Sequence, residues 1–204
     1  IRSNLFLNFT YQKLSIKEEY ETGQVGTGVI FDNNLCTLNN ASTVQFEGTD
    51  GVTITHNTFR NHVNEALGGG SNAFIKVFNG NTNSLVRDNI GDWLIYGYNV
   101  IGDWSPLTRD HNFLIDNNNQ NFTPPTGDTR VVNDAAMGFV NVTSADAGGD
   151  YHGYALAGGS TYKGAASDGK DPGVDFAALD AALGGVPSSK LTGRVSVTGR
   201  VTIQ

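Results

Sequence analysis

The hydrophobic pattern of the chain is repetitive. Residues 52–59 alternate apolar and polar side chains and then turn at an Asn, in the order Val-Thr-Ile-Thr-His-Asn-Thr-Phe. The same arrangement, an aliphatic residue followed three positions later by an Asn, recurs along the first half of the chain at intervals of 24 to 32 residues. The Asn residues of these repeats are Asn4, Asn33, Asn57, Asn89 and Asn118. A period of this length is typical of chains built from stacked structural units.

Each repeat predicts short β-strands that turn at Asn. Alternating aliphatic and β-branched residues favour strands, and Asn tolerates the left-handed backbone angles of a tight turn. Residues 26–48 contain three strand-like runs separated by two Asn-Asn pairs, which indicates a three-sided unit. The intervals lack the long helical pattern of a βαβ or leucine-rich unit. We therefore expect an all-β fold, a parallel β-solenoid, whose strands stack about 4.8 Å apart. The aliphatic residues would stack inside it, and the Asn side chains would form a ladder.

The pattern changes after residue 125. Residues 138–175 are rich in Gly and Asp and have little periodicity. We expect residues 1–137 to form the coils and residues 138–204 to form a loop-rich capping segment of the same domain. Such a cap is needed because a bare terminal coil exposes the core and an unpaired strand edge. Residues 195–203 alternate around a Gly and predict one or two closing strands, or the start of a further domain.

One short helix is predicted within the capping segment. Phe176, Leu179 and Leu183 have helical spacing, and two glycines follow them. Asp171 or Asp175 would lie near the start of this helix, where an acidic side chain caps backbone N–H groups.

These features resemble the right-handed parallel β-helix proteins of the pectate-lyase-like superfamily. Residues 51–59 are similar to their coil motif. Residues 138–175, with Asp-Tyr-His-Gly-Tyr and Ser-Asp-Gly-Lys-Asp-Pro-Gly-Val-Asp, are similar to the closing segment of secreted bacterial β-helix proteins. The resemblance implies a right-handed parallel β-helix, a secreted or cell-surface location, and a polysaccharide or glycan partner. Because the chain begins at Ile1 inside a coil motif, we expect a fragment of a longer protein.

Composition narrows the classes of partner. The chain has 204 residues, a net charge of −7 and only 16% charged residues. It has no basic stripe to neutralise phosphates, which argues against a nucleic-acid partner. No stretch approaches the roughly 18 apolar residues of a membrane span. The single cysteine, Cys36, excludes a disulfide framework and is interpreted as a small buried hydrophobe.

The residues that precede the repeated Asn residues form the first candidate site. Stacking in register would bring Asp32, His56 and Asp88 onto successive coils, each about 5 Å from the next, with Arg87 beside them. A His between two carboxylates can act as a general acid or base, and an Arg can act as a base or clamp a uronate carboxylate. These four are the candidate catalytic residues. In the alternative interpretation they are solvated side chains that pair along the stack.

Aromatic residues form a second candidate site. Trp93, Tyr96, Tyr98 and Trp104 lie in one repeat and its excursion, and exposed rings there could stack on sugar faces. In the alternative interpretation Trp93 belongs to the core and Trp104 fixes its loop.

Three carboxylates form a third candidate site. Asp168, Asp171 and Asp175 are three and four residues apart around glycines, which resembles a calcium loop without matching an EF-hand. No cofactor is required by this interpretation of the sequence, and calcium is the one that the sequence suggests. The alternative is a tight turn followed by a helix cap.

Two functions remain open at this stage. The first is a protein that acts on or binds polysaccharide, by lyase-like β-elimination or glycosidase-like hydrolysis. The chain matches no catalytic motif of these enzymes, so enzymatic activity stays undecided. The second is a non-catalytic structural, adhesive or assembly-forming extracellular module, which could self-associate through the open end of its coils. Fold alone does not decide between them.

Overall fold

The computed structural model describes residues 1–6, 14–17, 26–37, 44–60, 73–77, 81–93, 96–100, 107–117 and 121–184. Within this part of the chain the fold is mostly β-strand with a few short helices, and every pair of named strands is parallel. The predicted closing strands in residues 195–203 lie outside the described residues. Among the described residues, no helix has the length and apolar character needed to cross a membrane.

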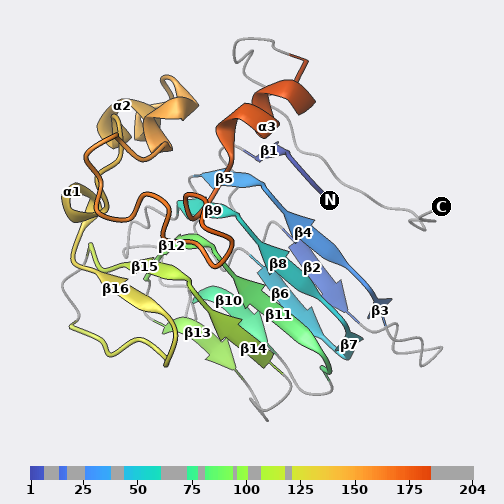
Figure 1. The fold of residues 1–204 in the computed structure, drawn as a ribbon. Helices are drawn as coiled ribbons and strands as arrows, with labels where there is room; N and C mark the ends of the chain where they lie inside the picture. The colour runs from blue at the N-terminus through green and yellow to red at the C-terminus, as the bar shows by residue number, and fades with distance from the viewer. Residues whose placement is uncertain are drawn as a thin grey trace.

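The strands form three larger sheets (Figure 1). Sheet I contains, in spatial order, β1 (Leu5–Phe6), β5 (Leu35–Thr37), β9 (Thr58–Arg60), β12 (Ile90–Asp92), β15 (Phe113–Ile115) and β16 (Thr129–Val131). Sheet II contains β13 (Tyr96–Val100), β10 (Ala73–Val77), β6 (Val44–Glu47) and β2 (Leu14–Lys17). Sheet III contains β14 (Leu107–Asp110), β11 (Ser84–Arg87), β8 (Thr53–Thr55) and β4 (Ile30–Asp32). A two-stranded sheet pairs β3 (Gly26–Thr27) with β7 (Thr49–Asp50).

The chain visits these sheets in a fixed order. From β4 it passes through sheets III, I and II, then returns to sheet III at β8 and repeats the circuit from β8 and from β11. Each strand pairs with the equivalent strand of the neighbouring circuit, as in Phe31 with Ile54 and Val86 with Ile54. Residues one circuit apart in sequence are therefore neighbours in space.

An Asn ladder runs along the corner between sheets III and I. The Oδ1 atom of Asn57 accepts from the backbone N–H and side-chain amide of Asn34, at 2.8 and 2.9 Å. Asn57 donates in turn to Oδ1 of Asn89 at 2.9 Å. The full ladder contains Asn4, Asn34, Asn57, Asn89, Asn112 and, as its last acceptor, Asp128. The predicted ladder is thus confirmed at Asn4, Asn57 and Asn89.

Two predicted ladder members are corrected. The ladder uses Asn34 instead of Asn33 and Asn112 instead of Asn118, which lies outside the described residues. Both errors arise because Asn residues stand side by side or recur within a few positions, so that sequence spacing alone does not fix the register. Asn33 instead takes the corner position just before the ladder, with a left-handed backbone (φ 54°).

The corner residue of each circuit has a left-handed backbone. These residues are Ser3, Asn33, His56, Asp88 and His111, with φ between 50° and 59°, followed by Gly127 at 92°. Positive φ is uncommon outside Gly, and Asn, Asp and His adopt it more often than most residues. Replacing one of these residues by a type other than Gly, Asn, Asp or His would strain the backbone. The corner also aligns five polar side chains along one edge of the stack.

Sheet I is buried on both faces. Its inward residues, including Cys36, Phe59 and Leu114, join the interior cluster with Phe31, and the Phe31 and Phe59 rings stack with centroids 6.1 Å apart. Its outward residues pack under residues 134–184, as Leu35 does with Tyr154 and Leu179. Consecutive buried residues in β5 and β15 follow from this double cover, because a strand buried on both sides loses its polar alternation. Three strands of sheet III, β4, β8 and β11, keep that alternation.

Residues 134–184 contain four short helical segments. They are α1 (Asp134–Met137), α2 (Val142–Asp146), the 3-10 turn η2 (Tyr151–Tyr154) and α3 (Phe176–Ala182). The predicted helix at 176–182 is confirmed, and of its two candidate caps it is Asp175 that accepts from Ala178 N. The prediction of a single helix is wrong, because the other segments are too short to give a hydrophobic period. Their start signals are the caps Asn133, Asn141 and Asp150.

One buried cation joins this segment to sheet I. Arg60 is fully buried, and its Nη1 atom lies 2.7 Å from Oδ1 of Asp92 and 2.8 Å from Oδ1 of Asp134. Its guanidinium lies 5.1 Å from the centre of the Phe139 ring. A buried Arg is retained at low cost only when carboxylates and rings compensate for its lost hydration. Residues 134–184 thus lie along the side of the strand stack (Figure 1).

Candidate functional site

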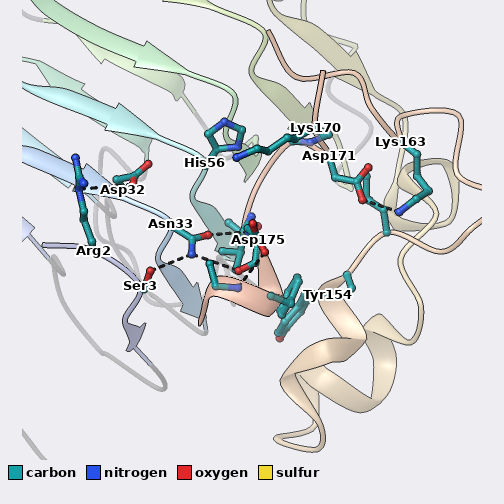
Figure 2. Close-up of a pocket in the computed structure, with 17 residues that line it drawn as sticks. Arg2, Ser3, Asp32, Asn33, His56, Tyr154, Lys163, Lys170, Asp171 and Asp175 are labelled. Atoms are coloured by element: carbon teal, nitrogen blue, oxygen red, sulfur yellow. Dashed lines mark hydrogen bonds and ion pairs between the residues drawn. The ribbon is translucent and has the colours of Figure 1, made fainter. Parts of the chain in front are cut away.

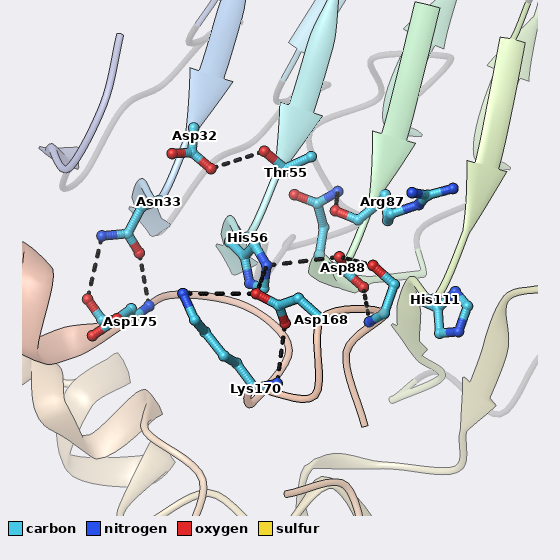
Figure 3. Close-up of polar contacts among 12 residues, drawn as sticks. Asp32, Asn33, Thr55, His56, Arg87, Asp88, His111, Asp168, Lys170 and Asp175 are labelled. Atoms are coloured by element: carbon cyan, nitrogen blue, oxygen red, sulfur yellow. Dashed lines mark hydrogen bonds and ion pairs between the residues drawn. The ribbon is translucent and has the colours of Figure 1, made fainter. Parts of the chain in front are cut away.

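One segment from the C-terminal part of the chain crosses the row of corner residues. Residues 167–175, called the strap, contact three successive circuits (Figure 3). Ser167 donates from its backbone N and its Oγ to the Asp88 carboxylate, each at 2.6 Å. Val174 N donates to Thr58 Oγ1 at 3.1 Å, and Asp175 N donates to Asn33 Oδ1 at 2.7 Å. The strap is therefore fixed by side chains that the corner presents.

The side chain of His56, one of the corner residues, faces the strap. Its Nε2 atom is 3.6 Å from Oδ2 of Asp88 and 3.4 Å from Oδ2 of Asp168, and its side chain is 18% exposed. Lys170 Nζ approaches the same Asp168 oxygen at 3.7 Å (Figure 3). The imidazole thus faces one buried carboxylate, that of Asp88, and one partly exposed carboxylate, that of Asp168. The predicted arrangement of a His between two carboxylates is present, with Asp168 in the place expected for Asp32.

Asp32 lies one position outside the corner. It pairs with Thr55 in sheet III, accepts from Thr55 Oγ1 at 2.8 Å, and lies 3.8 Å from Arg2 Nε. The one-residue error at Asn33 and Asn34 moved it into the corner column in the sequence interpretation. Asp32 nonetheless lines the same cleft as His56.

The cleft lies between the corner, the strap and the residues that follow η2. Its volume is about 600 Å³ (Figure 2). One wall holds Arg2, Asp32 and Asn33, and the strap contributes Lys170 and Asp175. The lining also includes polar residues such as His56, Lys163 and Asp171, and the apolar residues Leu156, Pro172, Val174, Phe176 and Ala178. The cleft therefore combines hydrogen-bonding groups of both signs with apolar surface.

Charges of the two signs are interleaved in the cleft. Lys163 Nζ lies 2.6 Å from Oδ2 of Asp171, whose Oδ1 accepts from Gly164 N at 2.9 Å. Burial alone would raise the pKa of the Asp168 carboxyl, but the backbone N–H of Lys170 and the charges of His56 and Lys170 lower it overall. Asp168 is thus held as an anion beside His56 and Lys170. Lys170 keeps most of its side chain exposed at the mouth of the cleft.

Arg87 lies apart from this cleft. It forms a bidentate ion pair with Asp110 on sheet III, at 2.5 Å from Nε and 2.8 Å from Nη2. The hydrogen bond to Asp110 raises the pKa of Arg87, and the same bond lowers the pKa of Asp110. Arg87 is not among the residues that line the cleft. Of the four predicted catalytic residues, the structure brings His56 and Asp88 together, places Asp32 nearby, and pairs Arg87 elsewhere.

The predicted aromatic site is described only in part. The Trp93 ring stacks on Phe122, with centroids 3.4 Å apart, and packs against the interior cluster, in agreement with its alternative role in the core. Tyr96 and Tyr98 belong to β13, and their side chains lie outside the described part. Trp104 also lies outside it.

The three carboxylates of the predicted calcium loop have separate partners. Asp168 faces His56, Asp171 binds Lys163, and Asp175 caps α3. Within the described ranges, no group of three or more His, Cys, Asp or Glu side chains is arranged to hold a metal ion. The turn-and-cap alternative describes Asp175 well, because its side chain accepts the N–H of Ala178.

Several residues of the cleft were missed by the sequence interpretation. Lys163, Lys170 and Tyr154 were not assigned to any site, and Asp168 was not connected to His56. The one available signal was the run Ser-Asp-Gly-Lys-Asp, because polar residues around a Gly indicate an exposed loop that carries function. Searches of protein-family models, curated proteins and solved structures found no match to this chain.

Proposed function

We propose that the circuits of this chain form a right-handed parallel β-helix of the pectate-lyase-like type, in a secreted protein. The support for this fold is the repeated passage through sheets III, I and II with parallel pairing between circuits. The Asn ladder at the corner adds to it, because a continuous ladder requires equivalent residues to stack. The outward face of sheet I is then covered by the closing segment.

The proposed ligand is a polysaccharide segment bound in the cleft. The observation that carries this proposal is the composition of the cleft, in which donors and acceptors from separate circuits lie beside apolar side chains. A sugar presents hydroxyl groups at its edges and C–H groups on its faces, so it needs both kinds of surface. Phe176 and Ala178 supply apolar contact, while Asp32, His56 and Lys170 supply polar groups. A volume of about 600 Å³ is large enough for a short oligosaccharide.

His56 is the proposed proton-transfer group if the bound chain is cleaved. Its ring has carboxylates within 3.6 Å on two sides, and it is partly exposed to the cleft. The Asp168 carboxylate would stabilise the ring when it carries the extra proton, and the Asp88 carboxylate would fix the orientation of the ring. An imidazole held between two carboxylates can pass a proton to or from a bound chain, and β-elimination and glycoside hydrolysis both require such a transfer. In a non-catalytic module the same groups would serve only as hydrogen-bond partners.

The proposal is tested with a panel of polygalacturonate, alginate, xylan and dextran. Binding is measured by isothermal titration calorimetry, and cleavage by the absorbance of unsaturated products and by new reducing ends. His56→Asn removes the imidazole and keeps a residue that tolerates the left-handed corner. We expect it to weaken binding roughly tenfold, the loss of one or two good hydrogen bonds. His111→Asn is the matched control, because His111 has the same corner position and does not line the cleft.

The outcomes separate the two functions. Binding with product formation that His56→Asn abolishes supports an enzyme, and binding without product formation supports a carbohydrate-binding module. If none of the four polysaccharides binds, or if His56→Asn and His111→Asn bind equally well, the cleft is not the glycan site.

A further inference from the structure

A second histidine fastens one wall of the cleft. His152 in η2 has its Nδ1 atom 2.7 Å from Oδ1 of Asp150 and its Nε2 atom 2.9 Å from Oδ2 of Asp180. Asp150 caps η2, and Asp180 belongs to α3. The imidazole therefore bridges two segments that are separated in sequence by the whole strap.

The groups packed around this imidazole are few and well defined. On the η2 side they are Asp150 and the Tyr151 ring, which stacks on His152 with centroids 4.3 Å apart. On the α3 side they are Asp180 and the Phe176 ring, whose centroid lies 5.6 Å away. The Tyr151 hydroxyl also donates to Asp180. Two carboxylates thus face one imidazole, and no described contact places another cation between them.

Both bridged segments border the cleft. Tyr154 of η2 and the next residues, Ala155 and Leu156, line one part of it, while Phe176 and Ala178 of α3 line another. α3 has seven residues, and a helix of that length is not stable alone in water. Its position depends on the buried Leu179 and on the bridge to His152. The spacing of these two walls therefore depends on the bridge.

We propose that His152 is a positioning residue that holds α3 against η2 while its imidazole is protonated, and that loss of this proton loosens the α3 wall of the cleft. The consequence for ligand affinity rests on the proposed polysaccharide function, whereas the movement of α3 does not. Neutral imidazole has one N–H, so it can donate to only one of the two carboxylates at a time. Deprotonation therefore breaks one arm of the bridge, so that the imidazole no longer joins Asp150 to Asp180.

The direction of the pH effect follows from the environment of the ring. Burial alone would lower the pKa of His152, but hydrogen bonds to Asp180 and Asp150 and their negative charges raise it above the ordinary value of 6.5. A raised folded-state pKa gives stabilisation that is complete below about 6.5 and is lost as the pH rises through the folded-state pKa. The α3 wall is thus fastened below about pH 6.5 and is released as the pH rises through the folded-state pKa of His152.

The ligand-free protein tests the bridge. Alanine methyl groups are labelled with ¹³C, and the Ala178 methyl resonance is followed by NMR between about pH 5.5 and about pH 9, together with the His152 ring resonances. We expect both to titrate with the same midpoint. His152→Gln, which carries no charge, should hold the chemical shift of the Ala178 methyl group at its alkaline value at every pH. His152→Arg, which keeps a positive charge, should hold this chemical shift at its acidic value. The proposal is overturned if the Ala178 chemical shift does not change as His152 titrates, or if His152→Gln leaves its pH dependence unchanged.

A binding measurement then connects the bridge to the ligand. For whichever of polygalacturonate, alginate, xylan or dextran binds, affinity should fall about fivefold across the His152 titration, the lower end of usual coupling between sites. His152→Arg should retain the acidic-solution affinity at alkaline pH. Equal affinity on both sides of the titration overturns the positioning role. If no polysaccharide binds, the failure belongs to the proposed function, because the methyl titration decides the bridge without any ligand.

Discussion

The Nε2 atom of His56 and the Oδ2 atom of Asp168 lie 3.4 Å apart, although the two residues are more than 100 positions apart in the sequence. His56 occupies a left-handed corner between sheets III and I, and Asp168 lies on the strap. Because the strap is fixed by Asp88, Thr58 and Asn33, this pair forms only when the strap lies across those circuits. The electrostatic environment of His56 is thus a property of the assembled fold.

Gly173 allows the strap to approach the strands, and a side chain there should displace it. Its φ is 77°, and a Cβ atom would lie 2.5 Å from Thr58 Oγ1 and 2.8 Å from Ile90 Cδ1. We expect Gly173→Ala to lower the free energy of unfolding by about 2–4 kcal/mol, from overpacking and backbone strain together. Gly169→Ala is the matched control, because φ is 80° there but no atom lies within 4 Å of the added Cβ. Urea unfolding measures both, and equal losses would contradict the close approach.

The centre of the Asn ladder should tolerate substitution poorly. Asn57 is fully buried, and its amide donates to Phe31 O, Thr55 O and Asn89 Oδ1 while its oxygen accepts from Asn34. Asn57→Ala leaves several of these groups without partners, so we expect a loss of about 3–5 kcal/mol. Asn117→Ala removes one exposed hydrogen bond, to Asp134 N, and should cost less than about 1 kcal/mol. Comparable urea midpoints for the two variants would argue against the ladder.

Arg60 should contribute more to the free energy of unfolding than an exposed cation such as Arg2. Arg60→Met removes the charge that compensates Asp92 and Asp134 and leaves these carboxylates without their cation. The expected loss is about 3–5 kcal/mol, the usual result of removing one partner of a buried ion pair. Arg2→Met is the control, because Arg2 is 64% exposed and lies 3.8 Å from Asp32, so its loss should be below about 1 kcal/mol. A thermal unfolding comparison in which both variants behave alike would refute this role for Arg60.

The bridge at His152 should also weaken in acid. The hydrogen bonds from Tyr151 and His152 lower the pKa of the Asp180 carboxyl below its ordinary value of 3.8. A lowered folded-state pKa gives stabilisation that is present above about 3.8 and is lost as the pH falls through the folded-state pKa. We expect the ¹³C resonance of the Asp180 carboxyl to titrate below 3.8, and Tyr151→Phe to move its midpoint upward, because the first of these donors is removed. An unchanged midpoint in Tyr151→Phe would show that the hydroxyl does not stabilise the Asp180 anion.

Much of the local structure could be predicted from the sequence. The strand and turn at Thr55, His56 and Asn57, and the helix that begins after Asp175, follow from side-chain alternation and from the capping preference of Asp. These signals lie within a few residues of each other, so no tertiary information is needed. The αL corner is likewise marked by His, Asp and Asn in the places where the backbone requires positive φ.

Tertiary structure alone decided the register and the composition of the site. The ladder contains Asn34 because its amide meets Asn57 in the next circuit. The sequence cannot distinguish Asn34 from Asn33, because the two Asn residues are adjacent. The partner of His56 depends on how the chain returns across the corner, since Asp168 reaches it through the strap and Asp32 turns toward Thr55. The repeats show which residues can stack, because the pattern within each repeat is visible in the local sequence. Long-range packing specifies which of them meet, because it is fixed by contacts such as Ser167 with Asp88 that no local pattern encodes.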